Sequence, residues 1–321
     1  MNRRDFVATA LGVASLPDVA RAQAGSRIRR VGWLDLSSSA ENLGTFVQAM
    51  GARGWVEGKT LRVDYRGGEG KPERLAAVAA ELARLPADLI VAPGTPEALA
   101  AKNATSTVPI VMTGVDDPVG RGIVGSLARP GGNVTGLASA RGELGAKLLS
   151  LLRDLSPRAT SVAVLVDAND PDHRVMLTQL QAAARNLGFA VHAQQVQRHT
   201  EVEPAFAAIR KQGSQLLVVP MSNMLIPRWT ADLALKHGLA LASTAPAYVY
   251  EGGLITYTDD WQALFDRAAM FVDRILKGAR PADLPVELPT KFKLIVNTKT
   301  ARALGITLPP AIMLQADHVV E

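Results

Sequence analysis

The chain contains no cysteine among its 321 residues. This absence excludes a disulfide framework, a thiolate zinc site, a thiol nucleophile and a lipid anchor on a cysteine after a leader. No unbroken apolar run reaches the roughly 20 residues that a membrane-spanning helix needs. Any function must therefore come from side chains that carry oxygen or nitrogen, and from backbone groups.

The sequence also lacks the motifs of common enzyme classes. There is no Gly-x-Ser-x-Gly elbow and no phosphate-binding Gly-x4-Gly-Lys-Ser/Thr run, and the histidines form no i, i+4 metal pair. The glycines at 120–125 have the spacing of a dinucleotide-binding loop. However, they follow the fourth expected strand instead of the first, and no acidic residue stands about 20 positions later. We predict no cofactor, no metal ion and no catalytic residue.

Charge of one sign is not concentrated anywhere along the chain. The net charge is +5, and the basic residues are scattered apart from a short group at 27–30. A nucleic-acid site needs Lys and Arg gathered on one face or stripe. The dispersed excess indicates solubility and weak attraction to anionic surfaces, so we do not expect nucleic acid as a partner.

The first 24 residues predict an export signal. Arg3-Arg4 precede Phe6 and a mild apolar stretch, and Ala22-Gln23-Ala24 has the small-x-small form of a cleavage site. The order Arg-Arg-x-Phe resembles a twin-arginine signal. Asn2 stands where Ser or Thr is usual, so general secretion stays open as the alternative route. Cleavage would leave a soluble periplasmic protein, without a lipid anchor, that begins at Gly25.

From position 28 onward, short β-rich runs alternate with helical stretches, and this alternation predicts parallel sheets with right-handed crossovers. The first set of expected strands is 31–36, 61–66, 88–92, 109–112 and 133–138. The second set is 161–166, 189–194, 215–219, 239–242 and 254–257. A long helix at 261–277 and a strand at 292–297 fit neither set, which indicates that the chain crosses between lobes more than once. We predict an α/β fold with two doubly wound, parallel-sheet lobes.

Hydroxyl and carboxyl groups follow three strands of the first set. Ligands of open α/β sheets bind outside the carboxyl ends of the strands. We therefore expect ligand contacts from Ser37, Ser38, Thr95, Pro96 and Asp116. Hydroxyls and free N–H groups at helix starts suit a carboxylate, and the aspartate suits a ligand amine. The alternative is that the hydroxyls only cap their own helices and that the aspartate is a solvated turn residue.

The second set of strands offers a matching group of side chains. They follow strands or lie near the end of the set, and we add them to the candidate site: Asp167, Asn169, Met221, Ser222, Tyr248 and Tyr257. A tyrosine ring would stack on an apolar or aromatic part of the ligand. The alternative is that both tyrosines are structural residues at a sheet edge.

Several runs of residues carry a family resemblance. The most specific is SLARPGGNVTG at 126–136. The others are GARGWVEGK at 51–59, DYR at 64–66, PERL at 72–75, GTP at 94–96, ATSTVPIV at 104–111, DPVG at 117–120, ILKGA at 275–279, PADLPV at 281–286 and PTKF at 289–292. Together they resemble the ABC-transporter substrate-binding proteins related to tryptophan and tyrosine binders, over nearly all of the mature chain.

The resemblance implies a type I periplasmic-binding fold, in which a ligand is trapped between two lobes joined by three hinge crossovers. We expect lobe 1 to comprise 25–138 plus about 258–288, and lobe 2 to comprise 139–257 plus about 289–321. The glycines at 120–125 would then shape a loop and a helix start on lobe 1. The chain departs from the family pattern around 243–248 and 258–260, next to the expected site, so the ligand of its relatives does not transfer directly.

The function implied by the resemblance is that of a periplasmic receptor, without enzymatic activity, for an ABC importer. It would deliver a small solute to an inner-membrane permease whose ATPase is a separate subunit, and we expect a monomer. An amino acid or close analogue is the favoured ligand, with an aromatic carboxylate that lacks the amine as the alternative. Two other functions stay open on the residues alone: a periplasmic α/β enzyme acting on a small carboxylate, and a ligand sensor for a membrane receptor.

Overall fold

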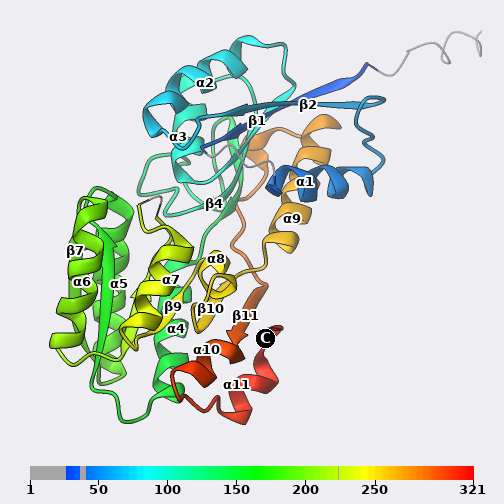
Figure 1. The fold of residues 1–321 in the computed structure, drawn as a ribbon. Coiled ribbons are helices and arrows are strands. Elements are labelled where there is room, and N and C mark those ends of the chain that lie inside the picture. The colour runs from blue at the N-terminus through cyan, green and yellow to red at the C-terminus, as the bar shows by residue number, and fades with distance from the viewer. Residues whose placement is uncertain (1–26, 37–40, 223) are drawn as a thin grey trace, which may run out of the picture.

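The computed structural model describes residues 27–36, 41–222 and 224–321. Within these residues the strands form two sheets, each covered by its own helices, and Figure 1 shows the resulting two lobes one above the other. The predicted export signal at 1–24 lies outside the described residues. It therefore stays a prediction.

The sheet of the first lobe has five parallel strands in the order β2-β1-β3-β4-β5. Their bounds are β1 (Arg29–Asp35), β2 (Leu61–Gly67), β3 (Leu89–Pro93), β4 (Ile110–Val115) and β5 (Val134–Ala138). The chain winds outward from β1 in both directions, so the strand order reverses between β1 and β3. Such a switch point is where open α/β sheets bind ligands.

Helices cover both faces of this sheet, because successive side chains of a strand point to opposite faces. Trp33 is fully buried on the side of α1 and α9, against the rings of Phe46 and Phe265 at centroid distances of 5.1 and 5.7 Å. Leu34, the next residue, lies in the core on the side of α2 and α3. The bounds are α1 (Glu41–Gly51), α2 (Pro72–Arg84), α3 (Thr95–Ala104) and α9 (Trp261–Leu276).

The sheet of the second lobe has seven strands in the order β12-β11-β10-β9-β8-β6-β7. All neighbours are parallel except β10 and β11, which are antiparallel. The bounds are β6 (Ser161–Asp167), β7 (Ala190–Val196), β8 (Leu216–Val219), β9 (Ala240–Ser243), β10 (Ile255–Asp259), β11 (Phe292–Asn297) and β12 (His318–Val320).

The helices of the second lobe also form two layers (Figure 1). One core cluster joins the sheet to α4 and α5 and to the C-terminal helices, and the other joins it to α6, α7 and α8. The bounds are α4 (Arg141–Leu155), α5 (Pro171–Asn186), α6 (His199–Lys211), α7 (Pro227–Lys236), α8 (Pro246–Tyr250), α10 (Thr298–Ala303) and α11 (Pro310–Gln315). The prediction of two doubly wound α/β lobes is confirmed.

Three details differ from the sequence-based expectation. The strand at 292–297 joins the second sheet in the antiparallel direction, although alternation alone indicated parallel pairing throughout. The helix at 141–155 was not expected. The glycine-rich stretch at 120–125 forms turns without a helix start: the N–H groups of 121–124 bond to carbonyls three to six residues earlier, and the Gly125 N–H bonds forward to Pro130 O.

The chain passes between the lobes three times, after β5, after β10 and before β11. The 3-10 turn η1 (Pro281–Asp283) packs on β5, and the chain beyond it returns to the second sheet. Backbone hydrogen bonds tie the crossovers to each other. The Ala138 N–H donates to Glu287 O at 2.9 Å, and the Asp260 N–H donates to Lys291 O at 3.0 Å. The third crossover is therefore paired with the first on the side of the first lobe and with the second on the side of the second lobe.

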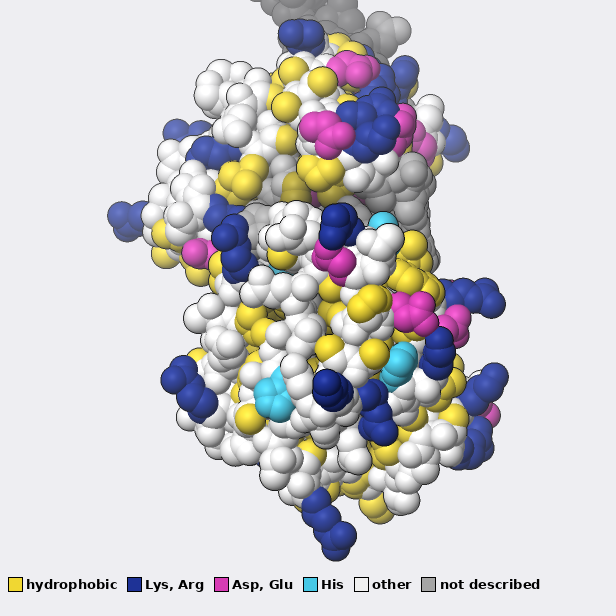
Figure 2. All heavy atoms as spheres, turned by 60° about the vertical axis from the view of Figure 1, so that its left-hand side comes forward, with side chains coloured by type: hydrophobic (Ala, Val, Ile, Leu, Met, Phe, Trp, Pro, Cys, Tyr) yellow, Lys and Arg dark blue, Asp and Glu magenta, His cyan; other side chains and the backbone are white. Residues whose placement is uncertain are grey.

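No helix among the described residues is long and apolar enough to cross a membrane. On the face shown in Figure 2, Lys and Arg side chains are spread over both lobes and alternate with Asp and Glu. This face presents no continuous basic stripe of the kind that tracks a phosphate backbone.

Candidate ligand-binding site

The carboxyl ends of the two sheets meet at the boundary between the lobes. An ion pair between Arg121 and Asp172 marks this meeting. Arg121 stands on the loop after β4 of the first sheet, and Asp172 lies in the first turn of α5, directly after β6 of the second. Carboxyl ends of parallel strands are the usual ligand position in this kind of fold. We therefore build the candidate site from the residues around this boundary.

The structure brings together two of the predicted residues of the first lobe. Thr95 is buried at the start of α3, and its Oγ1 accepts the backbone N–H of Asp116 at 3.1 Å. The hydroxyl thus ties the end of β3 to the end of β4 and does not cap its own helix, whose cap residue is Gly94. Asp116 is half-buried, whereas Pro96 is exposed. Thr95 and Asp116 form the first-lobe side of the site.

Ser37 and Ser38 lie outside the described residues, and their predicted role stays untested. The structure does show where the segment leaves the sheet. The Leu36 N–H donates to Oε1 of Glu97 at 2.9 Å, and Glu97 is a buried residue in the first turn of α3. This hydrogen bond links the end of β1 to the N-terminus of α3, which also carries Thr95.

On the second lobe the predicted polar residues form a connected hydrogen-bond group. Oδ1 of Asp167 accepts the N–H of Asn169 at 2.9 Å, and Oδ2 accepts the hydroxyl of Ser222 at 3.2 Å. Ser222 Oγ in turn accepts the N–H of Met224 at 3.0 Å. The carboxylate of Asp167 therefore joins the loop after β6 to the loop after β8. These loops form the second-lobe side of the site.

Sequence reasoning missed the residue that fixes these two loops, His173. Its ring is buried, with 4% of the residue exposed. Nδ1 accepts the backbone N–H of Asp167 at 2.9 Å, so the proton of the neutral ring is on Nε2, which donates to Met221 O at 3.0 Å. The Met221 side chain itself is exposed at the same place. Its position in the first turn of a helix after Asp167 is the only sequence signal that His173 offers.

The two predicted tyrosines are not equivalent in the structure. Tyr248 is 1% exposed, and its hydroxyl donates to Leu225 O at 2.5 Å from within the core. Burial raises the pKa of this phenol far above its usual value. Its ring therefore offers no surface to a ligand, and the interpretation of Tyr248 as a stacking residue is wrong. Tyr257 is half-buried and stacks on Phe292 at a centroid distance of 5.8 Å, where it packs against the second-lobe core.

Two further side chains, Arg121 and Trp261, lie near the end of β4 and were not among the predicted site residues. Arg121 is the only basic residue between Met112 and Arg129, but the glycine spacing around it drew attention away from its charge. Trp261 opens α9 directly after the crossover from β10, and its half-buried ring lies against Gly114 near the end of β4. It also stacks on Phe265 at a centroid distance of 6.0 Å. The sequence signal for Trp261 was its place, as an aromatic residue, directly after the end of an expected strand.

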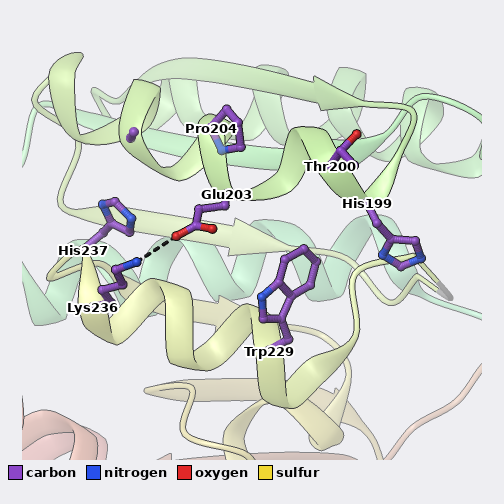
Figure 3. A pocket seen from close by; sticks show the side chains of 8 residues that line it. His199, Thr200, Glu203, Pro204, Trp229, Lys236 and His237 are labelled. Carbon is purple, nitrogen blue, oxygen red and sulfur yellow. Dashed lines mark hydrogen bonds and ion pairs between the residues drawn. The ribbon is translucent and has the colours of Figure 1, made fainter.

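A separate hollow of about 540 Å³ lies on the outside of the second lobe, between α6 and α7 (Figure 3). Trp229 and His199 stand at one end of it, with ring centroids 6.1 Å apart, and Glu203 and Lys236 pair across it at 2.7 Å. The hollow is open to solvent, and none of the predicted site residues lines it. It is a groove between two surface helices and not the place where two lobes enclose a ligand.

No group of three or more His, Asp or Glu side chains among the described residues is arranged to hold a metal ion. The site's chemistry is that of hydrogen bonds and charge. One carboxylate and a hydroxyl stand on the first lobe, a second carboxylate group stands on the other, and an arginine lies between them.

Comparison with known proteins identifies the family. The family model described as ABC transporter substrate binding protein matches residues 34–320. The tyrosine-binding protein of Clostridioides difficile is 27% identical over 276 residues, which cover 85% of this chain and 78% of that protein.

Two solved structures share the fold closely. A conserved domain protein from Vibrio cholerae is 26% identical with a TM-score of 0.83, covering 91% of this chain and 100% of that one. An ABC domain from Streptococcus pneumonia, solved in complex with L-Trp, is 24% identical with a TM-score of 0.81, covering 91% and 99%. The prediction of a binding protein instead of an enzyme is confirmed by the family and by its relative. The chain belongs to the family of ABC transporter substrate-binding proteins.

Proposed function

We propose that this protein is the periplasmic receptor of an ABC importer, and that it traps an amino acid with an aromatic side chain between its lobes for delivery to an inner-membrane permease. The single observation that carries the proposal is the family match over residues 34–320. The export signal at 1–24 and the lobe bounds, 25–138 plus about 258–288 and 139–257 plus about 289–321, belong to the same proposal. The ATPase would be a separate subunit.

The ligand class is supported by the chemistry of the site and by the relatives. A carboxylate would bind the N–H groups at the start of α3, where Thr95 stands, because helix N-termini favour negative charge. An amine would face Asp116. Trp261 offers a half-buried ring near the same strand end. A relative that binds tyrosine and a neighbouring fold that holds L-Trp fit this combination.

The test is a thermal-shift screen of the mature protein with matched pairs of ligands. L-tryptophan is compared with indole-3-propionate, and L-tyrosine with 3-(4-hydroxyphenyl)propionate, which lack only the amine. A ligand at 100 times its Kd should add about 2.7 kcal/mol to the free energy of unfolding. We expect stabilisation by the amino acids. Stabilisation by sugars alone would contradict the proposed ligand class.

Asp116→Asn examines the amine contact within the same screen. Loss of a charged hydrogen-bond partner should weaken an amine-bearing ligand by about 10- to 100-fold, and its deaminated twin much less. Asp232→Asn, at an exposed position on α7, is the matched control and should leave both affinities unchanged. Equal losses for the two members of a pair would remove Asp116 from the amine site.

A further inference from the structure

The ion pair between Arg121 and Asp172 is the feature from which we draw the inference, because it connects the two lobes away from the hinge. Nη2 of Arg121 contacts Oδ1 of Asp172. The Arg121 side chain is 25% exposed and that of Asp172 19%. The two charges are therefore largely withdrawn from water in the conformation described, and opening of the lobes must separate them.

The loop after β4, which carries Arg121, is held rigidly to the first lobe. Nε of Arg121 donates to the carbonyl of Asp116 at 3.0 Å. Short backbone hydrogen bonds, such as Ile123 N–H to Pro118 O at 2.8 Å, close the loop. Lys102 on α3 donates to the carbonyl of Ile123 at 2.6 Å. Val124 is buried in the first-lobe core beside Ile123. The guanidinium is thus placed by its own lobe before it meets the other.

The first turn of α5, which carries Asp172, is equally fixed on the second lobe. Asp170 caps α5 by accepting the N–H of Asp172 at 2.9 Å. The next residue, His173, is buried and bonds to the loops after β6 and β8. Both partners of the ion pair are therefore presented by preorganised supports. Their contact forms in one relative arrangement of the lobes, with little side-chain entropy left to lose.

We propose that Arg121 and Asp172 form an interlobe clasp, a pair of positioning residues that favours the closed arrangement of the lobes and slows release of the bound solute. The effect on the lobes follows from the ion pair itself. The effect on solute release rests on the proposed receptor function. The two parts are therefore measured separately, the first without any ligand.

The first experiment measures the distance between the lobes in the ligand-free protein. Because the chain has no cysteine, Glu73→Cys on α2 and Gln181→Cys on α5, both at exposed positions, provide unique labelling sites for a spin-label or fluorophore pair. Arg121→Gln and Asp172→Asn should each shift the distance distribution toward longer values. Arg129→Gln in the same loop and Arg174→Gln on α5, both exposed, are the controls and should not. Arg121→Lys, which keeps the charge, should fall between.

The second experiment measures release of L-tryptophan by stopped-flow fluorescence. Loss of a partly exposed ion pair should raise the off-rate about two- to fivefold in either single variant. The double variant Arg121→Gln/Asp172→Asn should be no faster than the singles, because the second change removes a partner already lost. Added salt should accelerate release from the wild type more than from the double variant.

Distinct outcomes overturn the clasp and the receptor function. If Arg121→Gln adds a further loss of affinity on top of Asp172→Asn and leaves the ligand-free distances unchanged, Arg121 contacts the ligand and no clasp exists. Unchanged distances in both single variants overturn it as well. Failure of L-tryptophan to bind would count against the proposed ligand and would leave the distance result as the decision on the clasp. Melting temperatures of all variants verify that they fold.

Discussion

At the scale of single residues, His173 joins the same two loops of the candidate site as the predicted residue Asp167. Its two ring nitrogens satisfy one backbone donor, the N–H of Asp167, and one acceptor, the carbonyl of Met221. These groups belong to loops that follow different strands. A buried imidazole that bonds through both nitrogens therefore sets the spacing of the second-lobe side of the site.

His173→Leu should destabilise the protein by about 2–4 kcal/mol, because it leaves two partly buried backbone groups without a partner. Urea unfolding gives the change in free energy. The affinity for L-tryptophan should fall with it, since the loops after β6 and β8 lose one of their links and keep only the bond between Asp167 and Ser222. His199→Leu, at an exposed helix start, is the control and should change stability by less than about 0.5 kcal/mol. A stability loss at His173 no larger than that of the control would contradict the linking role.

The sequence predicts that the residues of the candidate site lie at strand ends, but it does not predict the direction in which their side chains point. Thr95, Asp116 and Ser222 follow strands and Asp167 ends one, and alternation places the ends of parallel strands at one sheet edge. Whether a side chain faces the ligand or its own core depends on tertiary packing. Tyr248, which the sequence marks only as an aromatic after a strand, turns inward, because a short helix places its hydroxyl against the carbonyl of Leu225.

At the scale of elements, α9 is the helix whose placement decides the architecture. It follows a strand of the second lobe, yet it packs on α1 and β4 of the first. Trp55 Nε1 donates to Oδ1 of Asp273 at 2.8 Å, and Lys277 pairs with the same carboxylate at 2.7 Å. Burial alone would raise the pKa of Asp273, but the hydrogen bonds from Lys277 and Trp55 hold it below its ordinary value. The carboxylate thus fastens the returning helix to the turn that follows α1.

Asp273→Asn should lower the free energy of unfolding by about 1–2 kcal/mol at pH 7. Because the folded pKa is lowered, the contribution of the carboxylate is complete above the unfolded pKa of about 4 and is lost as the pH falls through the folded value. The gap between wild type and variant should therefore narrow below about pH 4. Urea titrations at several pH values measure it, with Asp232→Asn at an exposed position as the control. A gap independent of pH would show that the ionised carboxylate is not responsible.

The elements themselves were largely predictable, and the exceptions have physical causes. Continuous apolar runs, such as Leu89–Pro93, are typical of buried parallel strands, so the sequence predicts these strands directly. The helix Arg141–Leu155 carries Gly142 and Gly145, which weaken helix propensity. Tertiary packing compensates: at Gly145 a side chain would come within 3.0 Å of Leu180 on α5, so the small residue lets the two helices approach. Such compensation is invisible in a local pattern.

At the scale of the whole molecule, the connection between the lobes combines three crossovers with one anchor. Glu287 on the third crossover bonds by its backbone to β5 and by its carboxylate to Arg267 of α9, at 2.6 and 2.7 Å. This geometry fixes one end of the crossovers on the first lobe. We therefore expect any relative motion of the lobes in the short paired segments beyond, where the chain enters the second sheet. Motion about such paired segments is an opening and closing of the lobes.

Ligand binding should therefore make the molecule more compact without changing its secondary structure. A ligand that contacts both lobes binds the closed arrangement better than the open one, and it shifts the population by that difference in affinity. Small-angle scattering on the protein without residues 1–24 should show a smaller radius of gyration in saturating L-tryptophan, while the far-ultraviolet circular dichroism stays constant. Asp116→Asn should reach the same compact state, but at a higher ligand concentration because its affinity is lower. Arg121→Gln should have a larger radius of gyration than the wild type in the absence of ligand. A radius that does not respond to a tightly bound, saturating ligand would mean that the lobes do not move, and the hinge would then be only a structural connection.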